Sequence, residues 1–229
     1  MPAGSRPTGQ EWRSAGRGPA ISVIDMATIE SVTLEVADTT AADHFYTAAF
    51  GLGTQLRLRD SAAPTTGFRG FTLSLTVSRP ATVSGLVGAA LDAGATAVKP
   101  VAKSFWGYGG VVRAPDGTIW KIATAEKKDT GPATREIDQI VLLLGVGNMT
   151  ASKRFYVDHG LTVAKSFGRK YCEFAAESSP VKLALYGRRA LAKVAGVPAD
   201  GSGSHRLVID GDAGSFTDPD GFTWEPAAR

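Results

Sequence analysis

The sequence predicts an α+β protein made of two related halves. Two stretches carry this prediction, residues 114–123 and residues 218–227, which align without a gap. Each has the pattern of a strand, a Pro-Asp-Gly turn and a second strand, because proline presets φ and glycine accepts a positive φ. A tryptophan follows each turn, and because side chains alternate along a strand we expect Trp120 and Trp224 to face the helices. Two copies of one hairpin indicate an internal repeat.

The first half begins with a strand and a helix. Residues 31–36 are β-branched and alternate roughly between apolar and polar, which is typical of a strand. The helix predicted at 40–50 has an apolar face that includes Phe45 and Tyr46, and Gly51 ends it. The remaining elements of this half are predicted as strands at 55–59, 71–77, 97–101 and 109–113, and a helix near 82–93.

The polar segment 127–136 contains a glycine and a proline and is predicted to link the two halves. The order of elements then restarts, with a strand at 137–144 and a helix at 150–159. This helix carries Phe155 and Tyr156, the counterpart of the earlier Phe-Tyr pair. The remaining elements are predicted as strands near 163 and at 171–175, 181–186 and 205–210, and a short helical turn at 188–194.

These boundaries divide the chain into a tail and two domains. Residues 1–26 are rich in glycine, proline, serine and arginine and are predicted to be disordered. The domains are predicted at 27–126 and 137–229. The second lacks a counterpart of the helix near 82–93, and the first lacks the strand pair that residues 171–186 supply.

Composition argues against several classes of function. The chain of 229 residues is 43% hydrophobic and 21% charged, as in an ordinary globular protein. A net charge of +3 without a clustered basic face argues against nucleic acid, and no apolar run approaches the ~20 residues that cross a bilayer.

The single cysteine, Cys172, rules out an internal disulfide and fits a reducing, cytoplasmic compartment. The absence of GxGxxG, GxxxxGKS/T, HExxH and GxSxG motifs argues against hydride transfer, phosphoryl transfer and serine hydrolysis.

The order of these features resembles the vicinal oxygen chelate superfamily, which includes glyoxalase I, bleomycin-resistance proteins and extradiol dioxygenases. The resemblance rests on the Ser-Val-Thr-Leu-Glu-Val strand, the Phe-Tyr helix ending in Gly-Leu, segments 67–73 and 105–109, and both Pro-Asp-Gly turns. It covers roughly residues 27–227. The resemblance implies βαβββ modules that pair so that curved sheets form a cup around a ligand. We therefore expect two glyoxalase-like domains built from paired βαβββ modules, each with one abbreviated module.

The resemblance also implies where a metal would bind. Members of the superfamily use a His or Gln on the first strand of a module and a Glu on the last strand. In the first domain these positions fall on Ser31, Thr72 and Lys121. None is a plausible metal ligand, because a protonated lysine has no lone pair, and this cup is expected to be metal-free. Lys121 would either contact an anionic or carbonyl group of a ligand or extend its ammonium into water.

In the second domain the same positions fall on Gln139, Ala184, His205 and Glu225. One imidazole, one carboxylate and one amide oxygen are chemically acceptable for zinc, nickel, manganese or iron. Gln139, His205 and Glu225 are therefore candidate metal ligands, and Glu225 is also the candidate catalytic residue. The alternative is that His205 caps the end of a strand and that Glu225 is a hydrogen-bonded or exposed carboxylate.

Three aromatic side chains lie among glycines before a predicted strand: Phe105, Trp106 and Tyr108. They form either an aromatic wall over an organic ligand or a packed loop that covers the edge of a sheet.

The resemblance leaves three functions open. The first is a glyoxalase- or bleomycin-resistance-like protein that binds a small organic molecule in a cup-shaped β-sheet pocket, with no metal in the first domain and most simply no cofactor. The alternative is a metal-dependent lyase, isomerase or dioxygenase that uses a divalent metal in the second domain. A decayed relative that serves as a subunit is the third. The expected partner is a small organic molecule rather than nucleic acid or membrane, and the chain is expected to be a monomer or a homodimer.

Overall fold

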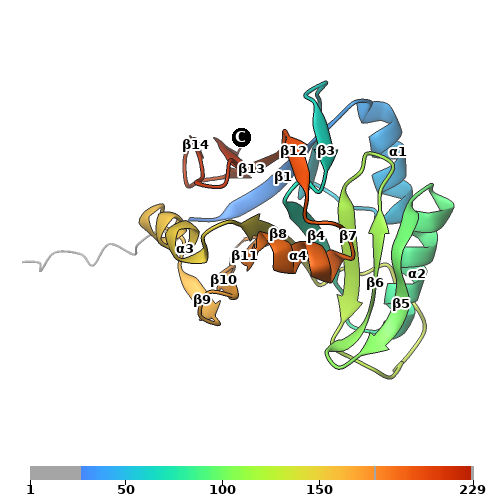
Figure 1. Cartoon of the computed structure of the whole chain (residues 1–229). Coiled ribbons are helices and arrows are strands. Elements are labelled where there is room, and N and C mark those ends of the chain that lie inside the picture. Colours follow the sequence, from blue (N-terminus) through green and yellow to red (C-terminus); the bar gives the residue numbers. More distant parts are fainter. Residues whose placement is uncertain (1–26, 178, 228–229) are drawn as a thin grey trace, which may run out of the picture.

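A computed structural model describes residues 27–177 and 179–227, so the predicted tail at 1–26 lies outside the described residues. The described chain forms four successive units (Figure 1). The first unit contains β1 (Ile29–Val36), α1 (Thr39–Ala49), β2 (Leu56–Asp60) and β3 (Thr65–Gly67). The second contains β4 (Phe71–Thr76), α2 (Pro80–Asp92), β5 (Thr96–Ser104), β6 (Gly107–Arg113) and β7 (Ile119–Thr124). The third contains β8 (Gln139–Val146), α3 (Met149–Asp158), β9 (Val163–Ser166), β10 (Tyr171–Phe174) and β11 (Val181–Gly187). The fourth contains α4 (Arg188–Ala195), β12 (Gly201–Gly203), β13 (Leu207–Gly211), β14 (Phe216–Thr217) and β15 (Thr223–Pro226).

The second and third units are complete βαβββ modules, whereas the first and fourth are abbreviated. The fold class that the sequence predicted is therefore confirmed. None of the helices within the described ranges is long and apolar enough to cross a lipid bilayer.

Strands from the two halves join in both of the large sheets. The eight-stranded sheet has the order β5-β6-β7-β4-β8-β11-β10-β9, and the five-stranded sheet has the order β14-β15-β13-β1-β2. In the larger sheet β4 pairs with β8 in antiparallel orientation, with Leu73 opposite Leu142. In the smaller sheet β1 pairs with β13 in the same way, with Val32 opposite Ile209. A third, two-stranded sheet pairs β3 with β12.

The expectation that the modules pair within each half is wrong, because each sheet takes its strands from both halves. The segment 127–136 joins β7 to β8, which lie in one sheet, rather than separating two cups. A sequence repeat reports the order of modules but not which strand edges meet. The domain boundaries at 27–126 and 137–229 stay a prediction.

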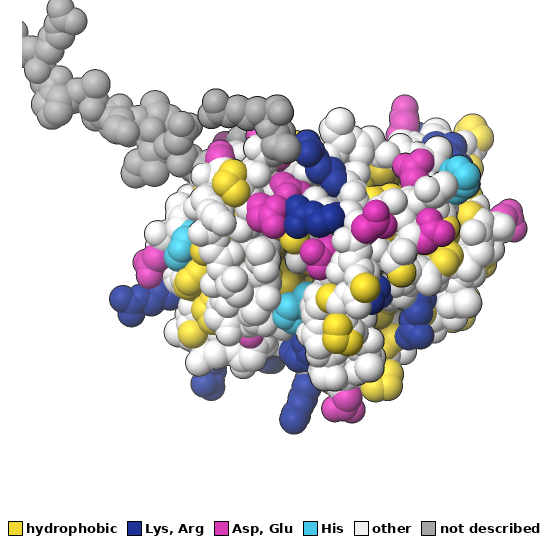
Figure 2. All heavy atoms as spheres, turned by 90° about the horizontal axis from the view of Figure 1, so that it is seen from above, with side chains coloured by type: hydrophobic (Ala, Val, Ile, Leu, Met, Phe, Trp, Pro, Cys, Tyr) yellow, Lys and Arg dark blue, Asp and Glu magenta, His cyan; other side chains and the backbone are white. Residues whose placement is uncertain are grey.

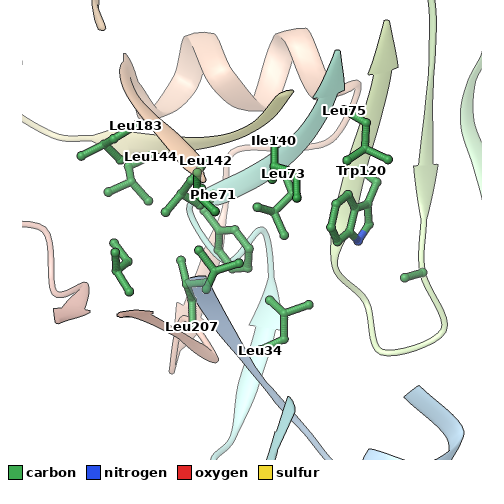
Figure 3. Close-up of a cluster of buried hydrophobic side chains, with 14 of the residues drawn as sticks. Leu34, Phe71, Leu73, Leu75, Trp120, Ile140, Leu142, Leu144, Leu183 and Leu207 are labelled. Atoms are coloured by element: carbon green, nitrogen blue, oxygen red, sulfur yellow. The ribbon is translucent and has the colours of Figure 1, made fainter. Parts of the chain in front are cut away.

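The main hydrophobic core lies between the two large sheets and extends to the buried faces of α1, α2 and α3. Figure 3 shows Leu34 of β1 and Leu207 of β13 facing Phe71, Leu73 and Leu142 of the larger sheet. Because side chains alternate along a strand, the residues between these core positions point to the opposite face of each sheet. We call this the outer face of each sheet, and it carries the candidate sites.

Matching contacts fix a helix to a hairpin in each half. Tyr46 of α1 packs against Trp120 with ring centroids 5.6 Å apart, and its hydroxyl donates to Asp116 at 3.1 Å. Tyr156 of α3 packs against Trp224 at 5.7 Å in the same manner. Both tryptophans are fully buried, so their predicted place in the core is confirmed.

Helix α4 covers part of the outer face of the eight-stranded sheet. It follows β11 directly and contacts β8, β11 and β4. Leu191 and Ala192 of this helix form a small second core with Phe68, Val111 and Ile119. The outer face of this sheet is therefore partly filled by the chain itself.

The exchange of strands between halves predicts that neither half folds alone as a monomer. Residues 27–126 produced separately would leave one edge of β1 and of β4 unpaired and would expose half of the core. We expect each fragment to lack a cooperative thermal transition as a monomer, and the two fragments mixed to regain it. Circular dichroism with light scattering measures both properties, and the intact chain 27–229 is the control. A monomeric 27–126 fragment with a sharp unfolding transition would contradict this expectation.

Candidate functional site

The outer face of the eight-stranded sheet brings Lys121 and Gln139 into one sheet. Lys121 lies opposite Ser74 on β4, and Gln139 lies opposite Thr76 on the other side of the same strand. The amide of Gln139 donates to the carbonyl oxygens of Ile140 at 3.1 Å and of Pro180 at 3.3 Å. Gln139 thus shares a sheet with the first-half position Lys121.

Lys121 is half-buried on this face. Burial lowers its pKa below the usual lysine value, and the nearby charge of Lys99 lowers it further. Lys99 itself donates to the carbonyl oxygens of Lys193 and Val194, at 3.0 and 2.6 Å, in the last turn of α4. Carbonyl groups at this end of a helix carry partial negative charge, which suits an ammonium.

His205 lies between β12 and β13 and connects two loops. One ring nitrogen contacts the carbonyl oxygen of Arg69, and the other lies 3.1 Å from the carbonyl oxygen of Asp220. The ring stacks on Phe222 with centroids 4.0 Å apart. A carbonyl oxygen can only accept, so both ring nitrogens are directed at acceptors. This arrangement matches the alternative in which His205 has a structural role beside a strand end.

Glu225 is held by an arginine from the other half. Arg59 of β2 donates to both carboxylate oxygens of Glu225, at 3.0 and 2.7 Å, and its guanidinium lies 3.9 Å from Glu35. The hydrogen bonds from Arg59 hold the pKa of Glu225 below its usual value. Since β13 and β1 lie between β15 and β2, this bidentate pair reaches across the outer face of the five-stranded sheet.

The same face carries a buried carboxylate. Asp210 accepts hydrogen bonds from Ser31 at 3.0 Å and from Thr33 at 2.8 Å. Figure 2 shows acidic and basic side chains gathered on the face seen from above, the side on which β13 and β14 lie in Figure 1. The outer face of this sheet is therefore a network of polar side chains bonded to one another.

The structure does not bring the three candidate metal ligands together. His205 and Glu225 line one cavity of about 330 Å³, but Gln139 is not among its lining residues and belongs to the other sheet. Within the described ranges, no group of three His, Cys, Asp or Glu side chains is arranged to hold a metal ion. With Glu225 bound to Arg59 and both nitrogens of His205 engaged, these residues do not fit a divalent metal.

The aromatic candidates do not gather around Lys121. Phe105 and Trp106 form the tip of the β5–β6 hairpin and are 81% and 83% exposed. The hydroxyl of Tyr108 lies 3.1 Å from the hydroxyl of Ser84 on α2, and its ring packs against the main core, on the face opposite to Lys121. The structure therefore places these rings apart from the lysine.

A cavity that no sequence pattern predicted lies where the two halves meet, and we call it the seam cavity. It has a volume of about 240 Å³. It is lined by Thr65, Thr66, Gly67, Phe68, Arg69, Phe71, Arg113, Gly117, Thr118, Ile119, Val197, Pro198 and Asp200. The sequence held one indication of this cavity, because segment 67–73, which supplies several lining residues, is among the stretches that carry the family resemblance. No local sequence pattern shows that β12 pairs with β3 to form one wall of the cavity.

Glycine at position 67 permits this wall. Gly67 pairs with Gly201 across the β3–β12 sheet and has φ +65. A Cβ at this position would lie 2.3 Å from the carbonyl oxygen of Asp200, which is too close for any side chain. The close approach of these strands closes one side of the seam cavity.

The fold agrees with that of known proteins. No family model and no curated protein matches this sequence. Glyoxalase I from Zea mays has a similar structure, with a TM-score of 0.57 at 15% identity over 86% of this chain and 91% of that chain. A putative dioxygenase from Bacillus subtilis subsp. subtilis str. 168 has a TM-score of 0.50 at 11% identity over 81% of this chain and 70% of that chain. The chain therefore has the glyoxalase-like fold that the sequence predicted.

Replacing Lys121 should stabilise the fold at neutral pH. Because the pKa of Lys121 is lower in the folded chain than in the unfolded chain, the protonated ammonium opposes folding, and this penalty disappears as pH rises toward the unfolded value of about 10.4. We expect Lys121→Met to raise the free energy of unfolding at pH 7 by up to about 1 kcal/mol, because solvent screens part of the effect. Urea titrations should show the difference shrinking between pH 7 and pH 10, whereas Lys170→Met at an exposed turn should change little. A Lys121→Met variant less stable than the wild type at pH 7 would contradict the conclusion that the charge of Lys121 opposes folding.

Proposed function

We propose that the chain is a binding protein that holds a small organic molecule in the seam cavity, at the rim of a glyoxalase-like sheet, without metal chemistry. The observation that carries the proposal is the cavity itself, which combines apolar walls with a few polar groups. Phe68, Ile119 and Val197 supply apolar surface, and Thr65 and Thr118 supply hydroxyl groups. Small-molecule sites in proteins have this mixed lining.

The size of the seam cavity limits the ligand. A cavity of ~150 Å³ lined by apolar side chains holds benzene. The volume of about 240 Å³ therefore suits a single ring with one or two substituents, or a branched chain of similar size. Larger ligands would extend toward Asp200 at its edge.

The residues at the superfamily's metal positions support a function without metal. Ser31, Thr72, Lys121 and Ala184 offer no metal ligand of the expected kind. Arg59 already neutralises Glu225 through two hydrogen bonds.

The alternative of a metal-dependent lyase or dioxygenase-type enzyme has one observation in its favour, because His205 and Glu225 line the same cavity. If a metal bound there, zinc, nickel, manganese or ferrous iron would raise the melting temperature of the wild type, and Glu225→Ala would abolish the increase. We expect protein purified without chelator to contain far less than one metal ion per chain by elemental analysis, and equal melting temperatures with and without each metal. A stoichiometric metal that is lost in Glu225→Ala would overturn the metal-free part of the proposal.

Binding in the seam cavity can be tested by filling it. Thr66 is exposed on β3 and lines the cavity, so Thr66→Trp places an indole at its mouth without disturbing the main core. We expect compounds from a library of single-ring molecules to raise the melting temperature of the wild type and to give saturation-transfer NMR signals. Both effects should disappear in Thr66→Trp and persist in Thr96→Trp, an exposed strand threonine that does not line the cavity. A library without any binder, or binders that Thr66→Trp leaves unaffected, would contradict the proposal.

A further inference from the structure

The seam cavity adjoins a second cavity, and arginines surround both. The adjacent cavity has a volume of about 640 Å³ and shares Thr66, Gly67 and Asp200 with the seam cavity. The seam cavity is lined by Arg69 and Arg113, and the adjacent cavity by Arg188 and Arg189. Asp200 is the only carboxylate residue among those that line either cavity. Four cations therefore face one anion in this part of the surface.

Among the described residues, none of these four arginines forms a salt bridge with a carboxylate. Within the ranges that the structure describes, the salt bridges involve Arg59, Arg154 and Lys182 but none of the four. Arg113 and Arg189 are exposed.

The two partly buried guanidinium groups bond to neutral oxygens. Arg69 donates to the carbonyl oxygen of Asp116 and, at 3.5 Å, to the hydroxyl of Thr118. The carboxylate of Asp116 is directed elsewhere, toward Tyr46 and the backbone and hydroxyl of Thr118. Arg188 donates to the carbonyl oxygens of Phe68 and Ala199, at 2.6 and 3.3 Å.

Burial of Arg69 without a direct salt bridge has an energetic cost. Loss of solvent lowers the pKa of Arg69, the charge of Asp116 offsets part of this decrease, and the charge of Arg206 lowers the pKa further. A guanidinium has five N–H donors, and the hydrogen bonds of Arg69 to Asp116 and Thr118 use two of them. An anion in the cavity would supply both the missing charge and the missing acceptors.

A buried hydroxyl points to the same conclusion. The Oγ1 atom of Thr65, which lines the seam cavity, is buried and has no hydrogen-bond partner in the described part of the chain. A buried polar atom without a partner costs free energy, and an acceptor bound in the cavity would satisfy it. Arg69, Arg113 and the residue that carries this unpaired hydroxyl therefore line the same cavity.

We propose that the ligand of the seam cavity is a small organic monocarboxylate. Its carboxylate would accept hydrogen bonds from Arg69 and Arg113, and its apolar part would pack against Phe68, Ile119 and Val197. The inference rests on the proposed function, because it names the chemical class of the molecule bound at that same site.

The test compares acids with their uncharged counterparts. A panel of small monocarboxylic acids and their primary amides, beginning with benzoate and benzamide, is titrated by isothermal calorimetry at fixed ionic strength. We expect at least one acid to bind about tenfold or more tightly than its amide, as a charge-assisted hydrogen bond requires. The affinity of the acid should fall as salt is raised, and that of the amide should not.

Two variants locate the charge. Arg113→Met should weaken the preferred acid about tenfold and leave its amide unchanged, because the exposed side chain of Arg113 can be removed without loss of buried contacts. Arg57→Met, at an exposed arginine of the five-stranded sheet, should change neither affinity. Arg69→Met is the second variant, with its melting curve as a folding check, because Arg69 also contacts the turn at Asp116.

The outcomes separate this inference from the proposed function. If ring compounds bind and Thr66→Trp blocks them, but no acid exceeds its amide, the carboxylate inference is wrong and the binding function stands. An acid whose affinity survives both Arg113→Met and Arg69→Met would also refute the inference, because its site must lie elsewhere. If inorganic phosphate binds as tightly as the best acid, the site recognises negative charge alone, and the inference of an organic monocarboxylate is wrong. If no organic compound binds, the proposed function itself fails.

Discussion

The antiparallel pairing of β4 with β8 and of β1 with β13 is the constraint on which the rest of the structure depends. It joins chain segments that are distant in sequence, as the hydrogen bond between Ser31 and Asp210, 179 positions apart, illustrates. An unpaired strand edge leaves backbone N–H and C=O groups without partners. The abbreviated first and fourth units complete each other, and the core of Leu34, Leu73 and Leu207 closes only when both sheets are present.

This pairing decides which side chains share a face. Lys121 and Gln139 come from different halves but lie in one sheet, whereas Gln139 and Glu225 come from one half and lie in different sheets. Glu225 instead meets Arg59, and the two hydrogen bonds between them fix a carboxylate that would otherwise be free to bind a cation. The chemistry of the five-stranded sheet therefore follows from its assembly rather than from the order of its residues.

The fourth unit covers part of the outer face of the eight-stranded sheet. Helix α4 places Leu191 and Ala192 against the eight-stranded sheet, and the chain that follows it supplies Val197 and Asp200 to the wall of the seam cavity. Helix α4 thus covers the centre of this face, and the seam cavity remains at its edge. In the described part of the chain, the four arginines that line this space and the adjacent cavity form no salt bridge.

The sequence by itself determined the order of the longer strands and helices, but not the short strands β3 and β12. It also determined the two Pro-Asp-Gly hairpins and the burial of Trp120 and Trp224, because these follow from turn chemistry and side-chain alternation over a few residues. It also indicated the glyoxalase-like fold. Tertiary structure alone decided which modules pair, that Arg59 meets Glu225, and that Arg188 reaches the carbonyl of Phe68. These contacts span 166 and 120 positions of chain and leave no local pattern. The seam cavity is invisible in the sequence for the same reason, since its walls come from both halves.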